Sequence, residues 1–293
     1  MRSQNRLVLG GAGVIAALAI VALCAPWLAP HDPLAVHLPE ALWPPSATYP
    51  LGTDQLGRDV LSRLIYGSRI SLLVGIVSVG IAIVVGSLIG LAAGFYGGWV
   101  DAILMRLVDT LLSIPTIFLL LAVMAMDPGE RLRGMEALPV VGLIAKGVFR
   151  LLDPHIVVLM AVIGLMSWMG VARLVRAEIL SVKEREFVLA SRLLGASPWR
   201  LMRVHLLPNA LAPVLVTATL GVGGAILTES LLSYLGLGVQ PPTPSWGNML
   251  NEGRIALGVA WWLTLTPGVC IFVTVMALNL LGEGIRERLS HAE

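Results

Sequence analysis

Charged residues are scarce in this 293-residue sequence. They make up 13% of it, against roughly 25% in a typical soluble domain. The 20 basic and 18 acidic residues leave a net charge of +2, which gives no nucleic-acid-binding footprint. The two cysteines, Cys24 and Cys270, both lie in apolar runs, so neither a disulfide framework nor a metal site is indicated. With 57% hydrophobic residues, the composition excludes a disordered chain, a coiled coil and an ordinary cytosolic enzyme.

Sequence motifs of common catalytic sites are also missing. There is no Gly-x-x-x-x-Gly-Lys-Ser/Thr loop for nucleotide phosphates and no His-Glu-x-x-His metal helix. The five histidines are scattered outside the long apolar runs, and Ser167 has no His or Lys beside it within such a run. We therefore expect no catalytic residue, no metal site and no cofactor bound by this chain.

What the sequence does contain is long apolar runs. A membrane-spanning helix needs about 20 mostly apolar residues. Six runs meet or approach this length: 7–28, 70–95, 103–126, 156–172, 210–235 and 259–281. They predict an all-α membrane protein with six transmembrane helices. We expect run 7–28 to be a retained anchor, because it is longer than the about 7–15 apolar residues of a signal-peptide core.

Basic residues are denser on one side of the predicted membrane, and they place both termini in the cytoplasm. The richest cluster falls between the fourth and fifth runs, at 173–203. A further stretch, 137–152, is short and contains Lys146 and Arg150, so we expect an amphipathic surface helix there rather than a seventh span.

The cytoplasmic segment 173–209 has the pattern of two short helices. Gly195 can take the left-handed conformation that closes a helix, Ser197 is a good N-cap, and Pro198 is a good first helical residue. On the first helix, Phe187, Ala190 and Leu194 share one face. So short a helix must dock on something, and its geometry alone leaves open whether this is the membrane surface or a cytoplasmic partner.

The spacing of this segment resembles the EAA loop of ABC-importer permeases, which reads Glu-Ala-Ala, three residues, Gly, nine residues, Ile, any residue, Leu-Pro. Aligned on Gly195, the triplet 189–191 is Leu-Ala-Ser, His205 takes the Ile position, and 207–208 is Leu-Pro. The departures are Leu189, Ser191 and His205. The resemblance implies an ATPase-docking loop that includes Glu186, Phe187, Leu189, Ala190, Ser191, Leu194, Gly195, Ser197, Pro198, His205, Leu207 and Pro208.

Two other stretches narrow the resemblance. YPLGTDQLGRDVLSRLIYGSRISL (49–72) and SYLGLGVQPPTPSWGNML (233–250) are similar to the second permease subunit of dipeptide, oligopeptide and nickel importers. This family implies a type I ABC-importer permease fold in a bacterial or archaeal plasma membrane. It implies a homologous second permease as a heterodimer partner, two cytoplasmic ATPases that bind ATP and Mg²⁺, and an extracytoplasmic substrate-binding protein.

On this resemblance, the chain divides into three parts. Residues 1–69 form an anchor, an external Pro-rich loop and an interfacial helix at 56–65; residues 70–282 form the permease domain; residues 283–293 form a cytoplasmic tail. Segment 127–154 is longer than the family leads us to expect and is interpreted as an external insertion. The resemblance implies that the chain forms half of a translocation pathway for di- and oligopeptides and couples it to the cytoplasmic ATPases. A nickel or metal-chelate importer is the alternative, and a stand-alone channel or secondary carrier is the rival from another class.

Polar and small residues inside the predicted spans are candidates for the pathway. Arg106 and Asp109 are three residues apart and could neutralise each other, and Glu229 is alone in its span. All three are candidates for lining the path. Pro115 is expected to kink the third span, because it removes a backbone donor. The repeat of glycines at 86, 90 and 94 favours close helix packing, with a moving seam as the alternative.

Overall fold

The computed structural model describes residues 2–126 and 153–290, and their regular secondary structure is helical. The predicted surface helix at 137–152 and most of the predicted insertion at 127–154 lie outside these residues. The helices, in chain order, are α1 (Arg2–Leu23), α2 (Ala25–Leu28), η1 (Leu38–Glu40), α3 (Val60–Tyr96), α4 (Gly98–Leu112), α5 (Thr116–Ala125), α8 (Pro154–Lys183), α9 (Glu186–Leu193), α10 (Pro198–Arg200), η3 (Leu201–Leu206), α11 (Leu207–Tyr234), α12 (Trp246–Gly253), η4 (Arg254–Ala256) and α13 (Trp262–Ser290).

Among the described helices, four are long and apolar enough to cross a membrane: α3, α8, the continuous helix 198–234, and α13. The pair α4 and α5 makes a fifth if the two count as one broken span. The apolar part of α1, Val8–Leu23, is shorter than a full span. The protein is therefore helical and built for a membrane, and the count of six spans stays a prediction.

The third predicted span is not one straight helix. α4 ends at Leu112, Pro115 lies at the N-cap of α5, and the two helices meet at 77°. The expected kink at Pro115 is thus a full break. Proline supplies no backbone N–H and pushes the residue before it out of helical conformation, so the chain restarts after it.

The start of α3 differs from the prediction. The Asp59 carboxylate caps the helix by accepting from the backbone N–H of Ser62 at 3.1 Å. The helix then runs unbroken from Val60, so residues 60–65 of the expected interfacial helix at 56–65 are instead the first turns of a span, and residues 56–59 precede the helix. At its other end, Gly97 and Gly98 have φ of 66° and 54°, which lets the chain turn back directly into α4.

The glycine repeat of α3 packs against α8. A Cβ added at Gly86 would lie 2.6 Å from Val171 Cβ, and one at Gly90 would lie 2.5 Å from the Ala172 carbonyl oxygen. At Gly94 it would lie 2.8 Å from Ile179 Cβ. The two backbones therefore approach as closely as they do because these residues have no side chain, and the packing interpretation accounts for the repeat.

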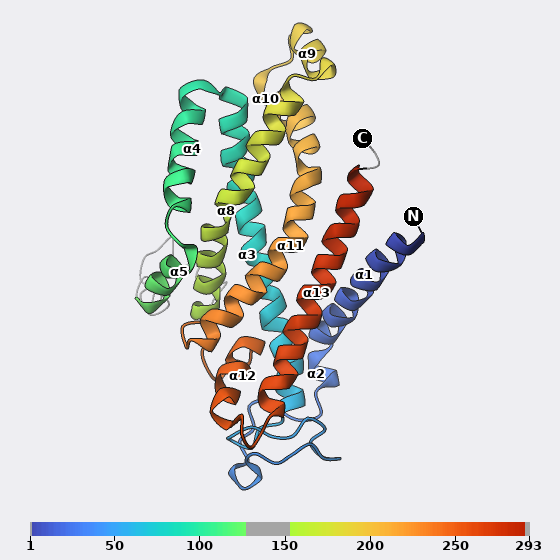
Figure 1. Cartoon of the computed structure of the whole chain (residues 1–293), viewed down its shortest axis with the longest axis vertical. Coiled ribbons are helices and arrows are strands. Elements are labelled where there is room, and N and C mark those ends of the chain that lie inside the picture. Colours follow the sequence, from blue (N-terminus) through green and yellow to red (C-terminus); the bar gives the residue numbers. More distant parts are fainter. Residues whose placement is uncertain (1, 127–152, 291–293) are drawn as a thin grey trace.

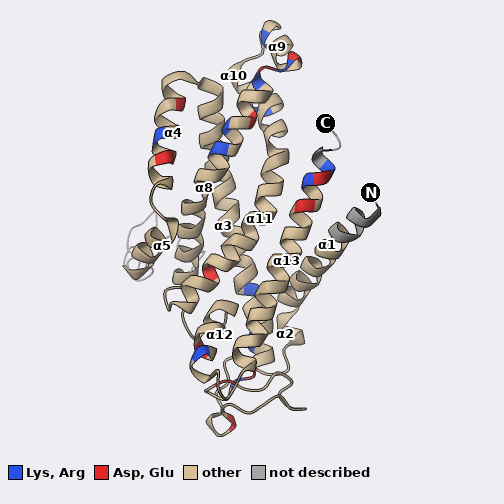
Figure 2. Ribbon diagram, in the orientation of Figure 1, with Lys and Arg blue, Asp and Glu red and all other residues tan. Residues whose placement is uncertain are grey.

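Figure 1 shows the arrangement of the helices. α9 and α10 project at one end, and α12 and the loop after α2 form the opposite end. Both ends of the described chain lie in the same half as α9. Charged residues gather toward the two ends, and the middle of the bundle carries few of them (Figure 2).

Candidate functional site

The loop at the α9 end begins with a short helix closed by local signals. Gly195 has φ of 80°, so its left-handed conformation ends the helix as predicted. The Ser197 hydroxyl then accepts from the backbone N–H of Arg200 at 3.4 Å, and Pro198 is the first residue of α10. The predicted separate second helix is different: α10, η3 and α11 follow without interruption, so the loop continues directly into a membrane-crossing helix.

Helix α9 (Glu186–Leu193) buries one apolar residue and exposes several others. Val188 is fully buried against the core formed by α8, η3 and the start of α11, which includes Leu201 and Leu206. In contrast, Leu193 and Leu194 are each 89% exposed. The exposed loop residues of the expected docking set are Glu186, Phe187, Leu189, Ala190, Leu194, Gly195, Ser197, Pro198 and Pro208, while Ser191, His205 and Leu207 are half-buried.

Two departures from the EAA pattern contact each other. The Ser191 hydroxyl lies 3.2 Å from His205 Nε2, and the His205 ring lies 6.0 Å from the Phe187 ring, between centroids. A pair of small and branched apolar residues is thus replaced by a polar pair that closes the same gap between α9 and η3. Neither Ser191 nor His205 predicts this contact by itself, because only the packing of α9 against η3 brings the two residues together.

Below the loop, α8 is tied to α3 and α4 by charged contacts. Arg176 binds both carboxylate oxygens of Asp101, with Nη2 to Oδ2 at 2.6 Å. Lys183 donates to the carbonyl oxygen of Phe95 at 3.0 Å, near the end of α3. The end of α8 next to α9 is therefore joined to both α3 and α4.

The structure places the three charged path candidates in different surroundings. Asp109 lies 3.9 Å from Arg173 on α8, so its ion-pair partner is not Arg106 as we expected. Both Arg106 and Asp109 are exposed on α4. The reason is tertiary: packing turns Asp109 toward α8, where a basic residue is within reach.

Glu229 is fully buried and surrounded by hydroxyl groups. Its Oε1 accepts from Ser233 at 2.8 Å and from Ser245 at 2.9 Å, and its Oε2 lies 3.4 Å from the hydroxyls of Ser71 and Ser230. Ser245 is also the N-cap of α12 and forms a capping box. Glu229 thus holds α11, α3 and α12 together rather than facing an open space.

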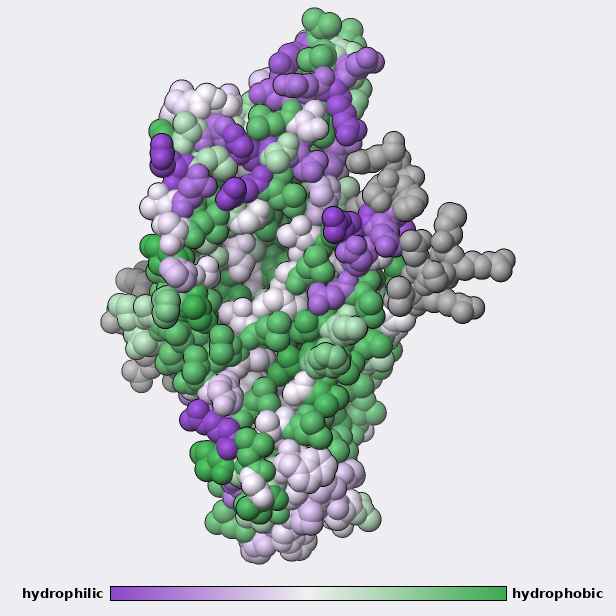
Figure 3. Space-filling model, in the orientation of Figure 1, coloured by the Kyte–Doolittle hydropathy of each residue, from purple (hydrophilic) through white to green (hydrophobic). Residues whose placement is uncertain are grey.

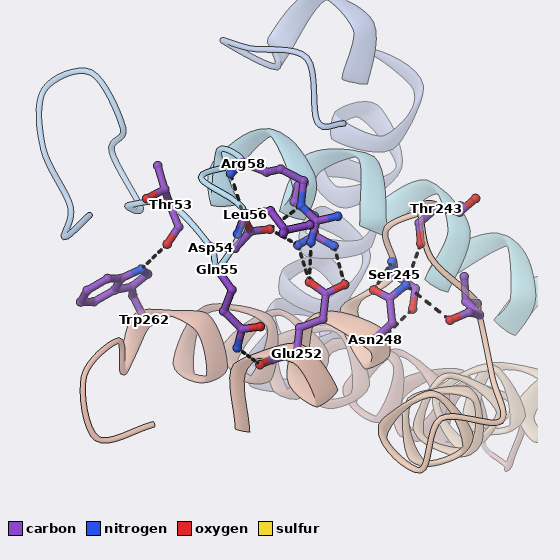
Figure 4. A network of polar contacts seen from close by, with 12 residues as sticks. Thr53, Asp54, Gln55, Leu56, Arg58, Thr243, Ser245, Asn248, Glu252 and Trp262 are labelled. Carbon is purple, nitrogen blue, oxygen red and sulfur yellow. Dashed lines mark hydrogen bonds and ion pairs between the residues drawn. The ribbon is translucent and has the colours of Figure 1, made fainter. Parts of the chain in front are cut away.

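A second polar network fixes the end of the molecule opposite α9 (Figure 4). Glu252 of α12 accepts from Arg63 of α3 at 2.5 and 3.0 Å and from Arg58 at 2.9 Å. Asp54 accepts from Arg58 Nε at 2.7 Å and also pairs with Arg63. Gln55 donates to the backbone carbonyl of Glu252 at 2.8 Å. The loop after α2, the start of α3 and the end of α12 are therefore one clamped unit, which we call the outer clamp.

Between these two ends lies a cavity of about 310 Å³, bounded by α3, α8 and α11. In Figure 3 the face between α8 and α11 is hollowed, and residues of intermediate hydropathy lie in the hollow. Arg106, Asp109 and Glu229 are not among its lining residues. The described part of the chain is therefore a helical membrane bundle with an exposed loop at one end, a clamped cap at the other and a cavity between them.

Comparison with known proteins identifies the family. The profile of binding-protein-dependent transport system inner membrane components matches residues 86–292, and that of the N-terminal TM domain of oligopeptide transport permease C matches residues 3–45. The chain belongs to the family of binding-protein-dependent transport system inner membrane components, which confirms the resemblance seen in its sequence.

Individual relatives carry more specific names. The chain is 40% identical to a di/tripeptide transport system permease protein DppC of Pseudomonas aeruginosa, over 98% of this chain and 88% of the relative. It is 36% identical to the oligopeptide transport system permease protein OppC of Bacillus subtilis, over 98% and 86%. A glutathione transport system permease protein GsiD of Pectobacterium atrosepticum is 38% identical, over 84% and 73%.

The sequence analysis did not predict the polar network of the outer clamp. Arg58, Arg63 and Asp54 all lie in the stretch 49–72, whose unusual composition was the signal. Their partner Glu252 follows the other unusual stretch, 233–250. The two stretches also meet in space, where the Trp246 indole N–H donates to the Leu64 carbonyl oxygen at 3.2 Å.

Proposed function

We propose that this chain is a permease subunit of an ATP-driven importer of di- and oligopeptides, and that it forms half of the translocation pathway. The family and the names of the relatives support this function, since the relatives include permeases for dipeptides, tripeptides and oligopeptides. The membrane is the plasma (inner) membrane of a bacterium or archaeon.

In the full assembly, this chain has four kinds of partner. A homologous second permease completes the pathway as a heterodimer, two cytoplasmic ATPases bind ATP and Mg²⁺, an external binding protein delivers the peptide, and lipid surrounds the helices. In this topology the chain crosses the membrane six times, with both termini and α9 in the cytoplasm and α12 outside. The shared location of the termini and α9 in one half of the molecule supports this orientation.

The observation that carries the proposal is the exposed face of α9. Leu193 and the C-cap residue Leu194 leave almost all of their apolar surface uncovered at the end of α9, a helix of eight residues that is too short to be stable alone. The same helix is anchored through Val188, so the exposed residues are held in place and not simply unfolded. A groove on one of the two ATPases would cover this face.

Coupling then follows from the contacts along α8. A partner can shift a two-state equilibrium only if it binds the two states differently. Closure of the ATPases would move α9, and the contacts of Val188, Arg176 and Lys183 would pass this displacement to α3 and α4. The close backbone packing of α3 against α8 makes the pair move as one body.

The test places a charge on the exposed face. Leu194→Glu should abolish co-purification of the ATPases and ATP-dependent uptake, because burying an unpaired carboxylate in an apolar groove is unfavourable. The variant should still insert and accumulate, since Leu194 is 89% exposed in this chain. The matched control is Ile255→Glu, an exposed apolar residue at the opposite end, 79% exposed. It should keep the ATPases.

Gly195→Pro and Ala190→Glu extend the test to the loop itself. Proline cannot adopt the positive φ of Gly195, so the turn between α9 and α10 must rearrange. Both variants should separate ATP hydrolysis from uptake while the chain still inserts. Normal uptake together with normal ATPase binding in Leu194→Glu, Gly195→Pro and Ala190→Glu would refute the docking role of this loop.

A further inference from the structure

The central cavity lies near the midpoints of three helices. Its volume of about 310 Å³ is at the lower end of the ~300–1,000 Å³ of ligand pockets. The residues that line it are small or medium-sized: Ser78, Val79, Ala82, Ile83, Ser167, Gly170, Val171, Thr217, Ala218, Gly221, Gly224, Ala225 and Thr228. None of them is charged, and none is a histidine, cysteine or methionine. The donor set therefore does not suit a metal ion, whose ligands are carboxylates, imidazoles and sulfur groups.

Hydroxyl groups give this lining its chemistry. Ser167, Thr217 and Thr228 each donate to the backbone carbonyl four residues earlier, at 2.7, 3.2 and 2.8 Å. A carbonyl oxygen can only accept, so each hydroxyl proton is used inside its own helix. What each group offers to the cavity is its oxygen lone pairs, which accept hydrogen bonds. The cavity therefore presents neutral acceptors on a surface of small side chains.

Two glycines leave the cavity open. A Cβ added at Gly170 of α8 or at Gly224 of α11 meets nothing within 4 Å. This distinguishes them from Gly86 and Gly90, whose missing side chains are needed for packing against α8. The room at Gly170 and Gly224 is thus free space in the cavity, not a close helix contact.

We propose that this cavity is this chain's share of the peptide path, and that Ser167, Thr217 and Thr228 contact the backbone N–H groups of a short peptide in transit. This inference rests on the proposed function. Neutral acceptors bind amides weakly, which suits a path that the cargo must enter and leave. Small side chains accept peptides of any side-chain type, because nothing in the lining selects for charge or shape.

Another hollow of the described structure is larger but differs in kind. It has a volume of about 530 Å³ between α1 and α3 and is lined mainly by Ala, Leu and Ile side chains, together with Tyr66 and Arg69. An apolar lining with one exposed cation at its edge suits a lipid better than a peptide backbone. The hydroxyl-lined cavity is therefore the one that matches the cargo.

The test fills the open space. Gly170→Leu and Gly224→Leu should reduce ATP-dependent uptake of labelled alanyl-alanine to the level measured without ATP, with the complex reconstituted in liposomes together with its binding protein. The matched control is Gly80→Leu on α3, where an added Cβ also meets nothing within 4 Å but the residue does not line the cavity. It should transport normally. All three variants should assemble with the ATPases.

A milder change tests the hydroxyls. Thr217→Val and Thr228→Val keep the side-chain shape and remove the acceptor, so uptake should fall by about two- to tenfold, the worth of one hydrogen bond. Normal uptake in the two leucine variants and in both valine variants would overturn the assignment of the path, while leaving the importer function intact.

The reactivity of introduced cysteines tests whether the cavity is a water-filled path, independently of which cargo the protein transports. In a chain whose Cys24 and Cys270 are replaced by serine, Ser167→Cys and Thr228→Cys should react with a charged, water-soluble thiol reagent during ATP turnover. Gly80→Cys should not react. If the two cavity cysteines were as unreactive as Gly80→Cys, the cavity would not be a water-filled path, whatever the protein transports. If labelling succeeded but no peptide were transported, the proposed function would fail and the path would remain.

Discussion

The ion pairs of the outer clamp allow us to predict how much stability the protein loses when Glu252 is removed. Glu252→Ala removes the carboxylate that pairs with both Arg63 and Arg58. Two guanidinium groups would then share the single carboxylate of Asp54, and the Arg63 side chain is only 2% exposed. Removing one partner of a buried ion pair costs about 3–5 kcal/mol, because the remaining charge is left uncompensated. Since the Glu252 side chain is 23% exposed, we expect the lower end of this range, about 3 kcal/mol.

The assay is thermal unfolding of the purified complex in detergent. At about 2 °C per kcal/mol for a chain of this length, Glu252→Ala should lower the Tm by about 6 °C. Glu252→Gln keeps the shape and one acceptor oxygen, so its effect should be smaller. The matched control is Glu283→Ala, which breaks an exposed pair with Arg286 whose partners are 57% and 70% exposed, and it should change the Tm by less than about 2 °C.

Equal Tm values for Glu252→Ala and Glu283→Ala would refute a stabilising role of the Glu252 ion pairs. Such a result would mean that water or a rearranged loop compensates the two arginines, and that the end of α12 is not held by charge. A loss of stability in Glu252→Ala without a loss of ATPase binding would be consistent with the clamp acting at the outer end alone.

Two further predictions concern packing and the loop. Gly90→Leu should prevent the chain from accumulating in the membrane, because the leucine side chain would meet the Ala172 carbonyl of α8. The control variant Gly80→Leu should accumulate normally. Quantitative immunoblots of membrane fractions measure both. The double variant Ser191→Ala and His205→Ile should keep ATPase binding and uptake close to wild type, because an apolar pair can close the same gap between α9 and η3, and uptake in vesicles measures it. Loss of uptake in the double variant to the level without ATP would show that the polar contact itself is required.

Several features of the fold could be predicted from residues that are close together in the sequence. The turn at Gly195, the cap at Ser197 and the helix start at Pro198 depend on residues within a few positions of each other, and the sequence predicts them correctly. The break at Pro115 was expected as a kink, because the lost N–H is a local property. Its angle of 77° depends on how α5 packs, which no local pattern contains.

Features that depend on long-range contacts were beyond the reach of sequence patterns. Arg63 and Glu252 are 189 residues apart, and their pairing requires the ends of α3 and α12 to meet. Asp109 has a basic residue three positions away in the chain, but packing gives it Arg173 instead. The cavity hydroxyls were missed for a different reason: serine and threonine within an apolar run give no signal until three helices are brought together.

Uptake of labelled alanyl-alanine by the reconstituted complex is the most direct measurement of the proposed transport function. The chain would be expressed with its native neighbours, purified in mild detergent and placed in liposomes with ATP inside and the binding protein outside. For an ATP-driven importer, we expect that ATPase subunits co-purify and that uptake requires both ATP and the binding protein. Uptake that proceeds without ATP, or a chain that purifies alone and still transports, would contradict it and indicate a channel or secondary carrier.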